Sequence, residues 1–138
     1  MAMHFDPEKF RQIVCASPFF QHLRMELLHF AEGEAFVGLQ VRPFHLNTQR
    51  IVHGGMLYTL ADTAAAIAVS TTLLPIQRPR TLSMEIQYLS PGSAGRTLEA
   101  HGQMVGSKES RVLAEAAVRD ESGKLLCTAR STYTIVGL

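Results

Sequence analysis

The sequence is poor in cysteine and has almost no excess of charge of either sign. Its 138 residues include only two cysteines, with no C-x-x-C pair or Cys/His spacing typical of a zinc or redox site. Cys15 and Cys127 both lie among apolar residues, which predicts small buried side chains in a reducing compartment. Thirteen basic and twelve acidic residues leave a net charge of +1, so no global field favours nucleic acid or an anionic membrane.

Two further absences concern location. No apolar run approaches the ~20 residues that a membrane-spanning helix needs. Residues 1–11 carry acids and a proline where a secretory signal would have a basic segment followed by an apolar one. We therefore expect a cytoplasmic protein that binds neither membrane nor nucleic acid. Because 46% of the residues are hydrophobic, the chain can bury one sizeable core, which favours a single domain over residues 1–138.

Hydrophobic periodicity predicts an α+β fold. Asp6 followed by Pro7 is typical of a helix start, and this first helix is expected to end near residues 17–18. A hairpin is expected over residues 25–41, where apolar residues alternate around a turn at 32–34. Four later segments alternate in the same way: residues 81–89, 97–105, 111–119 and 125–136.

Residues 54–72 form a different pattern, because they are rich in alanine and large aliphatic residues around the whole helical circumference. Such a helix must be buried on nearly all sides. The simplest solution is an antiparallel sheet of five or six strands that curls around this central helix.

Asp62 is the only carboxylate in the central helix. Burying an unpaired carboxylate costs several kcal/mol unless partners surround it, so the position indicates a functional group. Asp62 could instead point to solvent or be satisfied by backbone groups, which would make it structural.

The tripeptide His53-Gly54-Gly55 stands at the start of this helix, where N–H groups lack intrahelical acceptors and the helix dipole is positive. These amides could hold a carbonyl oxygen that develops negative charge. Alternatively, the glycines only permit a tight entry turn and His53 only caps the helix.

Gly54 and Asp62 are eight positions apart, which is ~12 Å of helical rise, so one chain cannot bring both to the same reacting atom. Two such helices lying antiparallel across a twofold axis would bring the start of one to the middle of the other. The spacing therefore predicts at least a homodimer with two composite sites.

These residues resemble the PaaI-like (phenylacetate-pathway) branch of the hotdog-fold thioesterases from about residue 34 to residue 136. The motif is Asn47, then His53-Gly54-Gly55, then Asp62. A second match is the predicted strand over residues 81–91, which ends in an aromatic-x-x-Pro signature. The resemblance implies a hotdog fold and an acyl-CoA thioesterase that hydrolyses aryl- or fatty-acyl-CoA to free acid and CoA, with no metal or cofactor. It also suggests a homotetramer built as a dimer of dimers.

The resemblance also implies roles for single residues. Asp62 would be the nucleophile or the general base, and the Gly54 amide would polarise the thioester carbonyl. Asn47 and His53 would support the carbonyl side from the opposite chain. Thr81 would orient the attacking water or the carboxylate, although it is also an ordinary β-branched strand residue.

The CoA phosphates need cations, which the turn at residues 106–111 offers where family members resemble it. The residues expected to bind CoA are Gly55, Lys108, Ser110 and Arg111. A solvated charged turn is the simple alternative. One departure from the family is Arg50, which stands where a glycine three residues before the histidine is common. Arg50 could reach solvent, pair with the phosphates or narrow the substrate entrance.

Two other functions remain open from the sequence. An enoyl-thioester hydratase or dehydratase would need a catalytic histidine paired with an acid. A non-catalytic acyl-CoA-binding module would keep Lys108 and Arg111 without needing Asp62. The position of His53 at the helix start, with Asp62 two turns on, favours the thioesterase.

Overall fold

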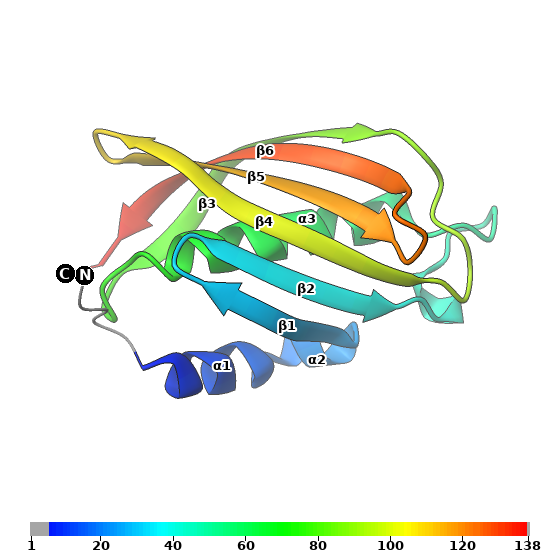
Figure 1. Ribbon diagram of the computed structural model, residues 1–138, viewed down its shortest axis with the longest axis horizontal. Helices are drawn as coiled ribbons and strands as arrows, with labels where there is room; N and C mark the ends of the chain where they lie inside the picture. The colour runs from blue at the N-terminus through cyan, green and yellow to red at the C-terminus, as the bar shows by residue number, and fades with distance from the viewer. Residues whose placement is uncertain (1–5, 138) are drawn as a thin grey trace.

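A six-stranded antiparallel sheet curls around one long helix in the computed structural model, which describes residues 6–137 (Figure 1). The strands are β1 (Met25–Ala31), β2 (Glu34–Gln40), β3 (Arg78–Tyr88), β4 (Thr97–Lys108), β5 (Arg111–Asp120) and β6 (Leu125–Val136). Their order in the sheet is β1-β2-β4-β5-β6-β3. The predicted hotdog arrangement, a sheet of five or six strands around a central helix, is confirmed.

The central helix, α3 (Gly54–Ser70), crosses the concave face of the sheet, and nine of its seventeen residues are buried. The helix and β4 approach each other closely at Gly102, where an added Cβ would lie 2.3 Å from the backbone oxygen of Ala64. A side chain at this strand position would push the helix away, so the glycine sets how tightly the sheet wraps.

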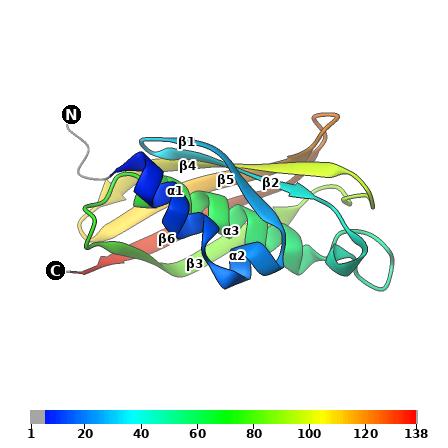
Figure 2. The same cartoon turned by 90° about the horizontal axis from the view of Figure 1, so that it is seen from below.

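The N-terminal part forms two short helices, α1 (Pro7–Cys15) and α2 (Pro18–His22), which lie alongside α3 and β1 (Figure 2). The predicted cap is confirmed, since the Asp6 side chain accepts hydrogen bonds from the amides of Glu8 and Lys9. The second helix was not predicted. Cys127 is buried as expected, but Cys15 is only half-buried because α1 lies on the outside of the domain and has no fully buried residue.

Strand β3 forms one edge of the sheet and pairs only with β6. Two large apolar side chains on it are about half exposed, Leu82 at 47% and Tyr88 at 53%. An edge strand with exposed apolar residues can pair with a further strand. None of the helices in residues 6–137 combines the length and the apolarity needed to cross a membrane.

Candidate active site

Asp62 lies in the middle of α3 and turns its half-buried side chain toward β3 and β6. The hydroxyl of Thr81 donates to its Oδ1 at 3.2 Å, and the hydroxyl of Tyr133 donates to the same oxygen at 3.3 Å. Both partners are side chains from strands, so Asp62 is neither free in solvent nor satisfied by backbone groups alone. A carboxylate held in this way at a helix–sheet junction is a candidate base or nucleophile.

The two hydroxyls meet because Thr81 and Tyr133 are directly paired across β3 and β6. Paired residues share one face of a sheet, which here is the face toward α3. Tyr133 is fully buried. Burial raises the pKa of its hydroxyl and the negative charge of Asp62 raises it further, so the group stays protonated and acts as a donor. The sequence interpretation missed Tyr133, although its phenol falls among the inward-facing positions of the last strand.

At the start of α3, His53 is the N-cap, and its Nδ1 accepts a hydrogen bond from the Gly55 amide at 2.8 Å. The Gly55 N–H is therefore engaged within the chain. Within residues 6–137, no acceptor is found for the Gly54 N–H, which remains available for a ligand oxygen. Of the two glycine amides, Gly54 thus fits the expected carbonyl-polarising role better.

A pocket of about 320 Å³ opens at this helix start, with Asn47, Gly54, Leu57, Tyr88 and Leu89 among its lining residues. The structure therefore places Asn47 and Gly54 at the same pocket. The Asn47 Oδ1 accepts hydrogen bonds from the amides of residues 49 and 51, which fixes its side chain in a turn.

Tyr88 is a second residue that the sequence interpretation did not assign to the site. Its hydroxyl donates to the Gly54 backbone oxygen at 3.1 Å, and burial is the main cause that raises its pKa. The sequence motif could have pointed to Tyr88, because this residue is the aromatic one in the aromatic-x-x-Pro signature.

Asp62 does not line this pocket. The carboxylate with its two hydroxyl partners and the helix start with its free amide are separate groups in one chain, as the spacing of eight positions required. His53 caps the helix and makes no contact with Asp62 among the described residues. His53 and Asp62, the histidine and the acid that a hydratase would have to pair here, are therefore not hydrogen-bonded to each other within residues 6–137.

The residues expected to bind the CoA phosphates lie at the tip of the β4–β5 hairpin. Lys108 ends β4, Arg111 starts β5, and both are exposed, as is Ser110. The hairpin projects at the end of the molecule where α3 ends, away from the start of that helix (Figure 1). Arg80 and Arg111 flank Thr134 in register on neighbouring strands, so they share one face of the sheet.

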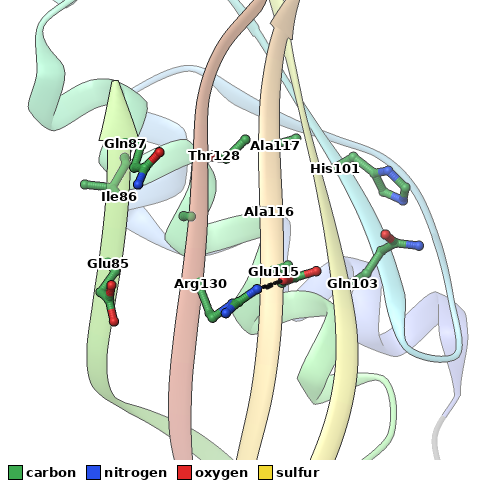
Figure 3. A pocket seen from close by; sticks show the side chains of 11 residues that line it. Glu85, Ile86, Gln87, His101, Gln103, Glu115, Ala116, Ala117, Thr128 and Arg130 are labelled. Carbon is green, nitrogen blue, oxygen red and sulfur yellow. Dashed lines mark hydrogen bonds and ion pairs between the residues drawn. The ribbon is translucent and has the colours of Figure 1, made fainter. Parts of the chain in front are cut away.

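A larger hollow of about 660 Å³ lies on the outer face of the sheet (Figure 3). Arg130 and Glu115 form an ion pair there, with 2.8 Å between Nη2 and Oε2. None of the residues expected in the site lines this hollow. The hollow lies on the opposite side of the sheet from Asp62. It is therefore not a candidate for the catalytic pocket, although it is larger than the pocket at the start of α3.

The fold and the Asn–His-Gly-Gly–Asp arrangement define the class of hotdog-fold thioesterases. The pattern of the Thioesterase superfamily matches residues 49–127, and this chain belongs to that family. It is a PaaI-like thioester hydrolase.

Individual relatives agree with this assignment. The acyl-coenzyme A thioesterase PaaI of Escherichia coli is 37% identical over 82 residues, which is 59% of this chain and 56% of that protein. A solved variant of the phenylacetic acid degradation protein PaaI from Thermus thermophilus is 35% identical, with a TM-score of 0.79 over 86% of this chain and 98% of the other. A protein of Streptococcus mutans, solved with acetyl CoA bound, is 25% identical, with a TM-score of 0.76 over 82% of this chain and 89% of the other.

Proposed function

We propose that this protein hydrolyses aryl- or fatty-acyl-CoA to the free acid and CoA, with Asp62 as general base or nucleophile. The observation that supports the proposal most strongly is the location of Asp62 and its hydrogen bonds. It is the only charged side chain on α3, and its Oδ1 is held by two hydroxyls from neighbouring strands. A carboxylate that is hydrogen-bonded by two hydroxyls within an otherwise apolar helix is suited to attack a thioester carbonyl, either directly or by activating water.

The carbonyl oxygen would be polarised by the Gly54 amide. This N–H has no acceptor among residues 6–137 and sits at the positive end of the α3 dipole. Such a preorganised donor stabilises the negative charge that develops on the carbonyl oxygen. Asn47 lines the same pocket, and His53 keeps its second ring nitrogen for a ligand while Nδ1 caps the helix.

The reacting unit would be a homodimer in which the β3 edges of two chains pair and the two α3 helices run antiparallel. The unpaired edge of β3 and the exposure of Leu82 and Tyr88 support this contact. Gly54 of each chain would then face Asp62 of its partner. Two such dimers would make the expected homotetramer.

The CoA moiety would be held by its phosphates on Lys108 and Arg111, with Ser110 and the region around Gly55 as further contacts. The acetyl CoA bound to the Streptococcus mutans relative supports CoA as the carrier. Guanidinium and ammonium groups at an exposed hairpin can bind phosphate while they stay largely hydrated, which keeps the desolvation cost small. Cys15 and Cys127 are both free thiols, which supports a reducing location such as the cytoplasm.

The Asp62→Asn variant tests the proposal. Its kcat should fall by at least about 10²-fold, because the amide keeps the shape of the carboxylate but can neither accept a proton nor attack. Steady-state hydrolysis of a panel of aryl-, short- and long-chain acyl-CoAs measures this loss and identifies the acyl group at the same time. An unchanged melting temperature serves as the control for folding. Near-normal turnover in the purified variant would refute the role of Asp62.

A further inference from the structure

Tyr133 is the largest fully buried side chain in the described part of the protein, and its hydroxyl is directed at Asp62. It donates to Oδ1 at 3.3 Å and lies 3.5 Å from the backbone oxygen of the same residue. Burying a phenol carries a desolvation cost that a phenylalanine of similar shape would avoid. We therefore attribute the presence of the hydroxyl to the hydrogen bond that it donates to Asp62.

The two donors converge on one oxygen of the carboxylate. Thr81 reaches Oδ1 from β3 and Tyr133 reaches it from β6, since the two residues are paired in register. No donor from residues 6–137 reaches Oδ2. The two carboxylate oxygens are thus unequal, because one is held by two hydroxyls and the other keeps its lone pairs for a ligand.

We propose that Tyr133 is a positioning residue which, with Thr81, holds Oδ1 of Asp62 and leaves Oδ2 as the reacting oxygen. This inference rests on the proposed function, in which Asp62 acts on the thioester. As a general base, Oδ2 takes a proton from water while the water oxygen bonds to the carbonyl carbon. The C–S bond then breaks with its electron pair on sulfur, and the departing thiolate receives the proton. As a nucleophile, Oδ2 bonds to the carbonyl carbon and the C–S electron pair leaves on sulfur; water then adds to the anhydride carbonyl, the bond to Oδ2 breaks to restore the carboxylate, and the proton that the water loses goes to the thiolate. On either route the two hydroxyls stay on Oδ1.

The described residues that pack around Asp62, Thr81 and Tyr133 bring no other charged side chain to the carboxylate. Val112, which pairs with Tyr133 on β5, is buried and apolar, and α3 has no other charged side chain. Asp62 forms no ion pair within the described residues. The orientation of its carboxylate therefore depends on the two hydroxyls. Rotation of the carboxylate would move the reacting oxygen, and small misplacements of a catalytic group cost up to about 10²-fold in rate.

The Tyr133→Phe variant tests the inference, because it removes the hydroxyl and keeps the ring. We expect kcat to fall about tenfold to a hundredfold while KM for acyl-CoA stays unchanged. Thr132→Val is the matched control, since it removes a hydroxyl from the neighbouring position on the other face of β6.

Thr81→Val removes the second donor and should lower kcat in the same way, with KM for acyl-CoA unchanged. The double variant Thr81→Val/Tyr133→Phe should lose more activity than the product of the two single losses, because no hydroxyl then holds Oδ1. An unchanged kcat in Tyr133→Phe would overturn the inference, as would a fall in kcat that is accompanied by an equal rise in KM or by a loss of the folded protein. Asp62→Asn distinguishes the two proposals, because its inactivity beside a normal Tyr133→Phe would leave the proposed function standing.

Discussion

At the scale of single residues, Arg50 has a backbone conformation that suits glycine. Its φ is +62°, in the left-handed region that costs a residue with a Cβ about 1–2 kcal/mol. Its amide donates to the Asn47 backbone oxygen at 3.0 Å, which closes the turn that carries Asn47. The resemblance to the PaaI-like branch implies a glycine here. The turn has the positive φ that a glycine adopts without strain, although this chain has an arginine.

Arg50→Gly should therefore raise the free energy of unfolding, by up to about 1 kcal/mol once the extra freedom of glycine in the unfolded chain is subtracted. Thermal or urea denaturation measures this gain. Arg24 is a matched control, because it is an exposed arginine with the same φ of +62° that lies outside the candidate site. Both variants should gain stability, but only Arg50→Gly should change KM across the acyl-CoA panel. A loss of stability in Arg50→Gly would contradict the assigned strain.

At the scale of elements, the β4–β5 hairpin gathers positive charge at one end of the sheet. Lys108 and Arg111 face each other across its tip, and Arg80 lies in the same cross-strand row as Arg111. Neither Lys108 nor Arg111 forms an ion pair within the described residues. Exposed cations without acidic partners are available to bind phosphate.

Replacing Lys108 and Arg111 with alanine should raise KM for acyl-CoA by about tenfold or more, since hydrogen bonds to charged groups contribute about 1.5–3 kcal/mol when they are not screened. KM for a truncated pantetheine thioester, which lacks the nucleotide, should change far less. The effect should also weaken as ionic strength rises. Arg119→Ala/Lys124→Ala, near the β5–β6 turn at the other end of the sheet, is the control. An equal rise in KM for both substrates would place the nucleotide elsewhere.

At the scale of the whole molecule, the two groups of the proposed catalytic site lie apart in one chain. The carboxylate with its two hydroxyl partners belongs to the middle of α3, whereas the free Gly54 amide belongs to its start. The ~12 Å rise between positions 54 and 62 cannot be shortened within a regular helix. A twofold contact along β3 would complete both sites at once.

Mixing two inactive variants tests this geometry. Asp62→Asn removes the carboxylate, and Gly54→Val places a branched side chain beside the oxyanion donor, where even a Cβ would lie 3.4 Å from the Tyr88 ring. After co-refolding, each mixed dimer has one site with both defects and one with neither. Random assembly makes half the dimers mixed, which should restore roughly a quarter of wild-type activity.

Each variant refolded alone is the control and should stay inactive. Mixed dimers can be counted by native mass spectrometry if one variant carries a small mass tag. Mixed dimers that form and remain inactive would show that the catalytic groups come from one chain.

The sequence by itself determined the elements and the main catalytic candidate. Strand alternation, the apolar circumference of residues 54–72 and the single carboxylate at Asp62 are local patterns, and each follows from the residues of one segment. The β5–β6 turn was predictable for the same reason. The β4–β5 turn was predicted too early, because β4 runs to Lys108, beyond the expected end at residue 105, and the turn falls at residues 109–110. The short helix α2 was missed because its five residues are too few to show a helical period.

Only the tertiary structure decided what Asp62 contacts. Thr81 and Tyr133 stand 52 positions apart in the chain, and they meet at one carboxylate oxygen because β3 pairs with β6 in a particular register. A shift of β3 by one residue against β6 would turn the Thr81 hydroxyl to the outer face and separate it from Tyr133. The register depends on how the sheet closes around α3, including the close approach at Gly102, and this long-range packing is not encoded in any single segment.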